Sequence, residues 1–173
     1  AATHPAGDHD GPPPLGPVGA LPVPDPVPQR SGLPWAMRIT SRFADADAHG
    51  LASDSCLARC AEQMRVEFLT QVFGARRLTS SSGFMVAHVA LRWLQRGKPP
   101  AEWQVAGGVL RLSERSMSVR GAVFDGDTCL AVCDSVMVAI DSASRRSAPM
   151  PEASHQLLAQ WLLPESARPA PTA

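Results

Sequence analysis

Two apolar periodicities divide the middle of this chain. Between residues 54 and 73, apolar side chains recur every three or four positions, a spacing that places them on one face of a helix. Ser53 or Asp54 suits the N-cap of this helix, and Gly74 suits its end. The pattern therefore predicts a single helix of about 20 residues, which is long for so small a domain and suited to serve as a rod that a sheet wraps.

Elsewhere the apolar residues alternate with polar ones, which is typical of strands. We expect strands at residues 35–43, 84–95, 102–112, 115–124 and 128–141, with turns at 97–100 and 125–127. In the second strand, one face is expected to carry Met85, Ala87, Val89, Leu91 and Trp93. A short amphipathic helix is expected from Pro151 through Leu163. One strand, a long helix and four antiparallel strands indicate an α+β fold.

The first 34 residues differ from the rest, because ten of the 17 prolines lie there. Proline removes a backbone donor and fixes φ, so this segment cannot join a helix interior or a central strand. We expect a disordered Pro-rich arm at residues 1–34, a folded domain at 35–163 and a disordered tail at 164–173.

Composition narrows the class of protein. The formal net charge is zero and no apolar run approaches the ~20 residues of a membrane span, so we expect neither a nucleic-acid nor a membrane partner. The cysteines form two pairs, Cys56/Cys60 and Cys129/Cys133. The second pair lies on an expected strand, where four residues span roughly 13 Å, too far to chelate one ion together. We therefore expect buried thiols in a reducing, cytoplasmic setting, and no metal or other cofactor.

Four motifs follow one another in the folded region. Residues 42–50 (RFADADAHG) link the first strand to the long helix, which contains residues 62–69 (EQMRVEFL); residues 112–116 (LSERS) form a turn, and residues 141–151 close the last strand with Pro149 and Pro151. In order and spacing, these motifs resemble the 4-hydroxybenzoyl-CoA thioesterase-like family over residues 37–152. The resemblance implies a hotdog fold, an antiparallel sheet wrapped around one long central helix.

The resemblance also implies an activity, the hydrolysis of acyl-CoA or acyl-carrier-protein thioesters without a metal. The family's catalytic acid in the loop before the helix falls on Asp47, and Glu62 is a looser match to the helix carboxylate of another branch. Arg115 and Ser116 match positions that bind CoA. A homodimer or homotetramer is expected, because pairing two subunits edge to edge would cover the edges of the sheet.

The residue types between the first strand and the long helix are also suited to thioester hydrolysis. Thioester hydrolysis needs a water or carboxylate to attack the carbonyl carbon, and donors to hold the oxyanion. We expect Asp47 to be nucleophile or general base, with the helix N–H groups of Asp54, Ser55 and Cys56 polarising the carbonyl. Gly50 would let the backbone approach the substrate closely, and His49 is either a proton carrier or a turn-exposed side chain.

Two residues depart from the family's pattern. Leu51 stands where many relatives carry a histidine, and an N-capping Asp54 would occupy the N–H groups that a substrate oxygen needs. Either the helix starts elsewhere, or Asp54 is the working carboxylate, or the site is altered. The alternative function is therefore a non-catalytic hotdog protein that binds an acyl thioester or serves as an interaction module. The paired histidine and acid of a hotdog hydratase are not evident.

Overall fold

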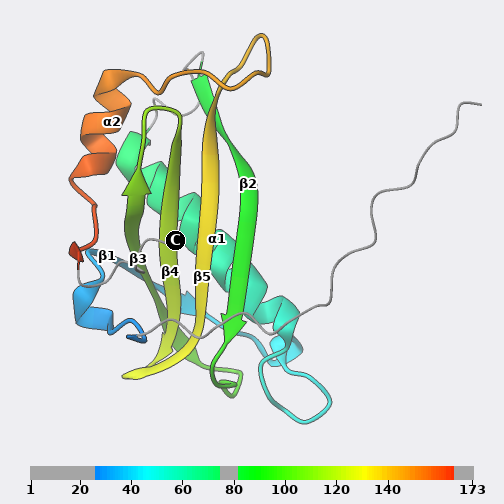
Figure 1. Cartoon of the computed structure of the whole chain (residues 1–173). Coiled ribbons are helices and arrows are strands. Elements are labelled where there is room, and N and C mark those ends of the chain that lie inside the picture. Colours follow the sequence, from blue (N-terminus) through cyan, green and yellow to red (C-terminus); the bar gives the residue numbers. More distant parts are fainter. Residues whose placement is uncertain (1–25, 75–81, 166–173) are drawn as a thin grey trace, which may run out of the picture.

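A computed structural model of the chain describes residues 26–74 and 82–165. Along the chain its elements are η1 (Arg30–Gly32), β1 (Trp35–Thr40), η2 (Phe43–Asp45), α1 (Asp54–Phe73), β2 (Ser82–Trp93), β3 (Glu102–Leu112), β4 (Ser116–Asp125), β5 (Thr128–Asp141) and α2 (Glu152–Ala159) (Figure 1). The expected order of one strand, a long helix and four strands is confirmed. Most of the expected Pro-rich arm (residues 1–25) and most of the tail (166–173) lie outside the described residues.

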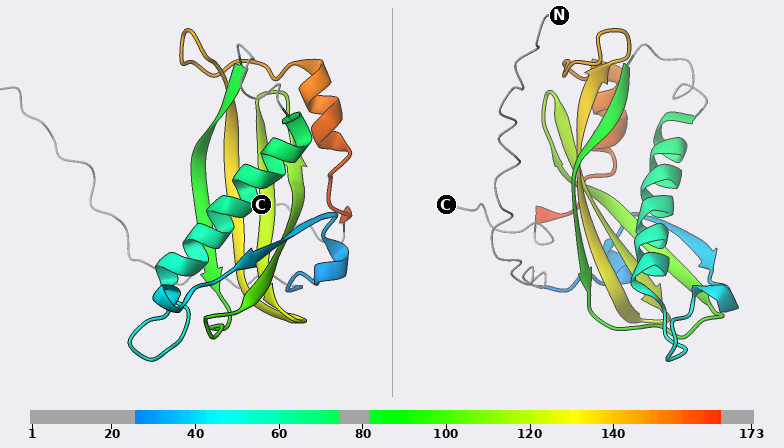
Figure 2. Two further views of the ribbon diagram at one scale, coloured as in Figure 1. Left: turned by 180° about the vertical axis from the view of Figure 1, so that it is seen from behind. Right: turned by 90° about the vertical axis from the view of Figure 1, so that its right-hand side faces the viewer.

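The five strands form one antiparallel sheet in the order β1-β3-β4-β5-β2, and α1 crosses one face of it diagonally (Figure 2). The chain therefore has the α+β hotdog fold that the motifs predicted. β1 and β2 are the two edge strands, and β2 is paired only through β5.

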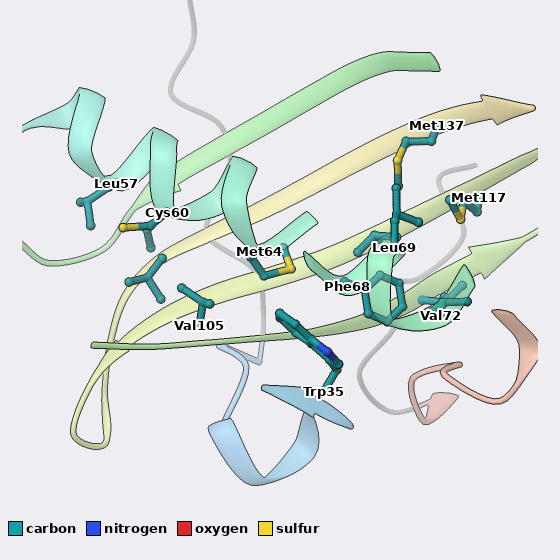
Figure 3. Close-up of a cluster of buried hydrophobic side chains, with 14 of the residues drawn as sticks. Trp35, Leu57, Cys60, Met64, Phe68, Leu69, Val72, Val105, Met117 and Met137 are labelled. Atoms are coloured by element: carbon teal, nitrogen blue, oxygen red, sulfur yellow. The ribbon is translucent and has the colours of Figure 1, made fainter. Parts of the chain in front are cut away.

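The core lies between α1 and the concave face of the sheet. The buried face of the helix carries Leu57, Met64 and Phe68, which pack against Val105, Met117 and Met137 and their neighbours (Figure 3). The helix lies close to the sheet because β4 presents a glycine beneath it: a Cβ on Gly121 would lie 1.9 Å from Met64 Cε. None of the helices within the described residues is long and apolar enough to cross a membrane.

A bulge in β2 changes which side chains share a face. The register shifts between Val86 and His88, so Ala87 has no partner on β5. Val89 is opposite Ser135 on the helix side of the sheet, whereas Met85 is opposite Val138 on the other side. The expectation that Met85 and Val89 share one face was therefore wrong, because one extra residue inverts the alternation.

The outer face of the sheet carries a second apolar cluster. Leu33 and Leu163, from opposite ends of the domain, pack there with Phe124 and Val132. Ordered packing therefore begins slightly before Trp35, the boundary that we expected. The second helix ends at Ala159, earlier than the expected Leu163, because the following residues pair with the edge of β3.

Two backbone hydrogen bonds make this edge pairing. The N–H of Val109 donates to Trp161 O, and the N–H of Leu163 donates to Val109 O, both at 2.8 Å. β1 pairs with β3 only as far as Gly107, so residues 161–163 continue the edge that β1 leaves uncovered.

Candidate active site

Asp45 organises the loop between β1 and α1. Its side chain is buried, 6 % exposed, and accepts hydrogen bonds from the Arg42 backbone N–H at 2.7 Å and from the guanidinium of Arg59. The Arg42 N–H is the main cause that lowers the pKa of Asp45, and the two arginine charges add to it while burial opposes it. Its carbonyl oxygen accepts the Ser53 N–H at 3.0 Å. Asp45 thus closes the loop onto the start of α1, a role that the sequence did not reveal.

Asp47 occupies the turn of this loop, and both oxygens of its carboxylate accept hydrogen bonds. Oδ1 accepts the backbone N–H groups of His49 at 2.8 Å and Leu51 at 3.0 Å, and Oδ2 accepts Arg96 Nη1 at 2.9 Å. The Leu51 and His49 N–H groups are the leading causes that lower the pKa of Asp47, with a smaller contribution from the Arg96 charge. The carboxylate of Asp47 is therefore anionic at neutral pH.

The start of α1 lies next along the chain. Ser53 is the N-cap, and its Oγ accepts the Cys56 N–H at 3.2 Å. Among the described residues, no acceptor bonds the N–H groups of Asp54 and Ser55. The helix thus starts one residue earlier than an N-capping Asp54 would require, so Asp54 is its first residue and not its cap. Cys56 is less suited than expected to hold an oxyanion, because its N–H is already bonded.

Arg96 joins the two carboxylates. It follows β2, and its guanidinium bonds Asp47 Oδ2 through Nη1 and Asp54 Oδ1 through Nη2, both at 2.9 Å. Asp54 therefore pairs with Arg96 and does not cap its own helix. No pattern in the sequence indicated Arg96, because it lies between the expected strand at 84–95 and the expected turn at 97–100.

His49 and Gly50 shape the turn. Gly50 has φ 73°, in the left-handed region, and its N–H donates to Asp47 O at 3.0 Å. A Cβ at Gly50 would meet nothing within 4 Å in this chain, so the turn conformation, and not a close contact, accounts for glycine here. The side chain of His49 is exposed, and its backbone N–H serves Asp47.

Glu62 lies apart from this cluster. It is exposed on α1, eight residues beyond Asp54, which is roughly 12 Å along the helix axis. No described residue donates a hydrogen bond to its carboxylate. Within one chain, Glu62 and Asp47 are not brought together.

Arg115 and Ser116 lie at the other end of the sheet. The loop of Asp47 follows Thr40, which pairs with Glu102 at the start of β3, whereas Arg115 follows the end of β3 at Leu112. Ten residue steps along β3 separate these ends by roughly 33 Å. Arg115 is 51 % exposed and donates to Ser147 O at 3.4 Å. The expected CoA-binding residues are thus distant from Asp47 of the same chain.

Cys56 lies between the loop and β1, where it lines a cleft of about 420 Å³ with Cys60, Arg42, Asp45 and Arg59. All four cysteines are free thiols, and burial raises the pKa of each. Within residues 26–74 and 82–165, no three His, Cys, Asp or Glu side chains converge so as to hold a metal ion.

This fold agrees with the family comparison. The sequence profile of the Thioesterase-like superfamily matches residues 41–162, more than half of the chain, and the chain therefore belongs to that superfamily. The resemblance that the motifs predicted is confirmed. No curated protein matches the chain.

Solved structures share the fold at low identity. A thioesterase superfamily protein from Jannaschia sp. CCS1 matches with a TM-score of 0.71 and 15% identity, covering 78% of this chain and 96% of that one. A protein from Pseudomonas aeruginosa PAO1 matches with a TM-score of 0.70 and 18% identity, covering 79% and 96%. A thioesterase from Thermus thermophilus, in complex with coenzyme A and Zn, matches with a TM-score of 0.65 and 22% identity, covering 80% and 98%.

Proposed function

We propose that this protein hydrolyses acyl-CoA thioesters with Asp47 as its attacking carboxylate or general base. One observation carries the proposal: an anionic carboxylate is fixed in the loop that enters α1, and Arg96 links it to Asp54 in the first turn of that helix. A base or nucleophile and an oxyanion-binding helix end are the two parts that thioester hydrolysis requires.

In the general-base route, Asp47 takes a proton from a water molecule while the oxygen of that water forms a bond to the carbonyl carbon. The carbonyl oxygen becomes an oxyanion that accepts hydrogen bonds from the first N–H groups of α1. The carbon–sulfur bond then breaks, and the leaving thiolate takes the proton from Asp47. In the nucleophilic route, the carboxylate first expels the thiolate and forms an anhydride, which water then hydrolyses.

The active form in this proposal is a homodimer that pairs through β2. This edge strand exposes Met85, Val86 and Val89, at 43%, 42% and 45% exposure. A long edge strand with exposed apolar side chains is a template for pairing with a second copy. A two-fold axis makes such a pair antiparallel, with the start of one β2 beside the end of the other.

This pairing accounts for the distance between Asp47 and Arg115. The start of β2 pairs with Asp141, at the end of the sheet that carries Arg115. The end of β2, at Trp93, leads to Arg96, which bonds Asp47. Antiparallel pairing therefore brings the Arg115 end of one copy beside the Asp47 end of the other. Arg115 and Ser116 are then suited to bind a CoA phosphate. The coenzyme A bound to the thioesterase of Thermus thermophilus supports CoA as the thiol part of the substrate.

Release of free CoA tests the activity. Acetyl-, hexanoyl-, lauroyl- and benzoyl-CoA are each incubated with the wild type, and free thiol is followed with a colorimetric reagent. Asp47→Asn should lower kcat for the best substrate by at least ~100-fold, the scale of losing a general base. Asp125→Asn, which changes an exposed carboxylate at the end of β4, is the matched control and should leave kcat unchanged. Full activity in Asp47→Asn would refute the assignment.

Glu62→Gln decides between the two carboxylates that the family resemblance suggests. Because Glu62 is exposed and remote from the Asp47 loop within one chain, this variant should keep the wild-type kcat. A loss in Glu62→Gln with normal activity in Asp47→Asn would move the site to the helix.

The second candidate is a protein that binds acyl thioesters without cleaving them. Two features favour it: Leu51 stands where the family resemblance implies a histidine, and all three hydrogen bonds to the Asp47 carboxylate come from the chain itself. Calorimetric binding of an acyl-CoA without release of CoA would support this candidate over hydrolysis.

A further inference from the structure

Arg96 lies between two carboxylates that belong to different segments. Its two terminal nitrogens each bond one of them, Asp47 in the loop and Asp54 in the first turn of α1, at 2.9 Å. The guanidinium fork is planar and always charged, so it holds two acceptors in a fixed relation that an ammonium group cannot reproduce.

The charges of this trio do not cancel. Two carboxylates and one guanidinium leave a net charge of −1, so one negative charge is compensated while one remains for chemistry. Asp47 is the more enclosed of the two carboxylates, with its side chain 23% exposed against 60% for Asp54. Arg96 therefore holds the more enclosed carboxylate in place and also pairs with the one at the helix start.

An uncompensated Asp54 would oppose the reaction. A side-chain carboxylate in the first turn competes for N–H groups of the helix start. It would also repel an oxyanion forming there, because two like charges a few ångströms apart near a protein surface still repel each other appreciably. In this structure Asp54 is directed to Arg96, and the N–H groups of Asp54 and Ser55 keep no acceptor among the described residues.

The backbone that carries Arg96 is fixed. Gly97 is buried, and its carbonyl oxygen accepts the Ala52 N–H at 2.8 Å. The position of Arg96 relative to the loop is therefore set by main-chain contacts and not only by the ion pairs.

We propose that Arg96 is a positioning residue for thioester hydrolysis: it aims Asp47 and draws Asp54 away from the helix N–H groups that receive the carbonyl oxygen. This inference rests on the proposed function and adds a residue to it. It predicts that the loss of kcat on removing Arg96 depends on the charge of Asp54.

Four variants test this prediction: Arg96→Met, Arg96→Lys, Asp54→Asn and the double variant Arg96→Met/Asp54→Asn. Each is assayed on the best substrate of the acyl-CoA panel. Arg96→Met should lower kcat by roughly 10- to 100-fold, the scale of a misplaced reacting group. Asp54→Asn alone supplies the single-variant reference of the double-mutant cycle, since it removes the side-chain charge and leaves the backbone N–H in place. The double variant should recover at least ~3-fold over Arg96→Met, and Arg96→Lys should recover part of the activity.

Arg38→Met is the matched control. Arg38 makes an ion pair of the same length, 2.9 Å, with Glu102, but both side chains are exposed and outside the loop. It should keep the wild-type kcat and KM.

Two results would overturn the inference. If Arg96→Met raises KM, leaves kcat unchanged and gains nothing from Asp54→Asn, Arg96 binds the substrate's phosphates instead. If kcat and thermal stability fall together and Asp54→Asn restores neither, the role of Arg96 is only structural.

A wild type that cleaves no member of the panel would refute the proposed function, and a second readout then decides the role of Arg96. The amide N–H resonances of His49 and Leu51 report the ionisation of Asp47, because both donate to its Oδ1. In Arg96→Met, the pH at which these resonances shift should rise, and in Arg38→Met it should not. An unchanged midpoint in Arg96→Met would show that Arg96 does not act on Asp47.

Discussion

The backbone N–H of Ala52 donates a 2.8 Å hydrogen bond to the carbonyl oxygen of Gly97, and this bond joins the Asp47 loop to the segment that follows β2. Ala52 is fully buried, so the bond is shielded from water. Two regions distant in sequence therefore share one backbone contact beside the proposed site, and a change at Gly97 reaches both.

Replacing Gly97 by alanine should destabilise the protein. The new Cβ would lie 2.6 Å from Trp103 Cζ2 and 2.7 Å from Leu130 Cδ1, and both side chains are buried. We expect the free energy of unfolding to fall by about 1–3 kcal/mol, as in other overpacked cores, measured by denaturant unfolding. Gly32→Ala, where a Cβ meets nothing within 4 Å, is the control. Equal stability of the two variants would contradict the packing described here.

Asp45 should contribute stability that depends on pH. Its pKa in the folded protein lies below the ordinary value, first because the Arg42 N–H donates to it. The contribution is therefore present above the unfolded pKa of about 3.9 and is lost as the pH falls through the folded pKa. Asp45→Asn should cost about 1–3 kcal/mol at pH 7, and this difference from the wild type should shrink below pH ~4.

Chemical denaturation across pH 3 to pH 7 (roughly the span over which carboxylates titrate) measures this difference. Asp127→Asn is the control, since Asp127 is 97% exposed and its ion pair with Arg30 is 3.5 Å long. That variant should stay within ~0.5 kcal/mol of the wild type. If the loss of unfolding free energy in Asp45→Asn grew on acidification, Asp45 would not stabilise the folded protein as an anion.

The thiols should be unreactive while the protein is folded. Burial raises the pKa of Cys60 to about 12 and that of Cys129 to about 11. At pH ~8 the thiolate fraction that reacts with a disulfide reagent is then small, whereas an unfolded cysteine has a pKa near 8.5. Labelling should be slow in buffer and reach all four thiols in guanidinium. Fast labelling of the native protein would contradict this, and would also obscure the assay for CoA release.

The β2 edge should determine the oligomeric state. Val89→Lys places a charge on the edge strand, a change that natural sheets use to prevent edge pairing. We expect light scattering to give a dimer for the wild type and a monomer for the variant, with loss of thioester hydrolysis. Val27→Lys, at a residue 41% exposed outside this strand, should remain a dimer. A dimeric Val89→Lys would move the interface elsewhere.

Local patterns were enough to predict most of the fold. The spacing of apolar residues gave α1 at Asp54–Phe73, and alternation gave four strands to within two residues, whereas β1 ends at Thr40, three residues before the expected end at Phe43. The errors lie where a local period is broken by a non-local contact. The bulge in β2 inverts a face, and the turn of chain at Ala159 follows from the bonds that residues 161–163 make to Val109.

The site was less predictable, because its side chains come from segments far apart. The loop motif identified Asp47, His49 and Gly50, but their partner Arg96 is 49 residues from Asp47 and 42 from Asp54. No period along the chain reports a contact of that span. The same holds for Asp45, whose carboxylate pairs with Arg59 from the helix.

The separation of Asp47 and Arg115 along β3 has a genetic consequence. If each site draws these residues from different copies, a chain altered at Asp47 and a chain altered at Arg115 can complement each other. A mixed dimer of Asp47→Asn and Arg115→Met would hold one site with both changes and one with neither. Unfolding and refolding the two inactive proteins together should therefore restore about one quarter of the wild-type activity.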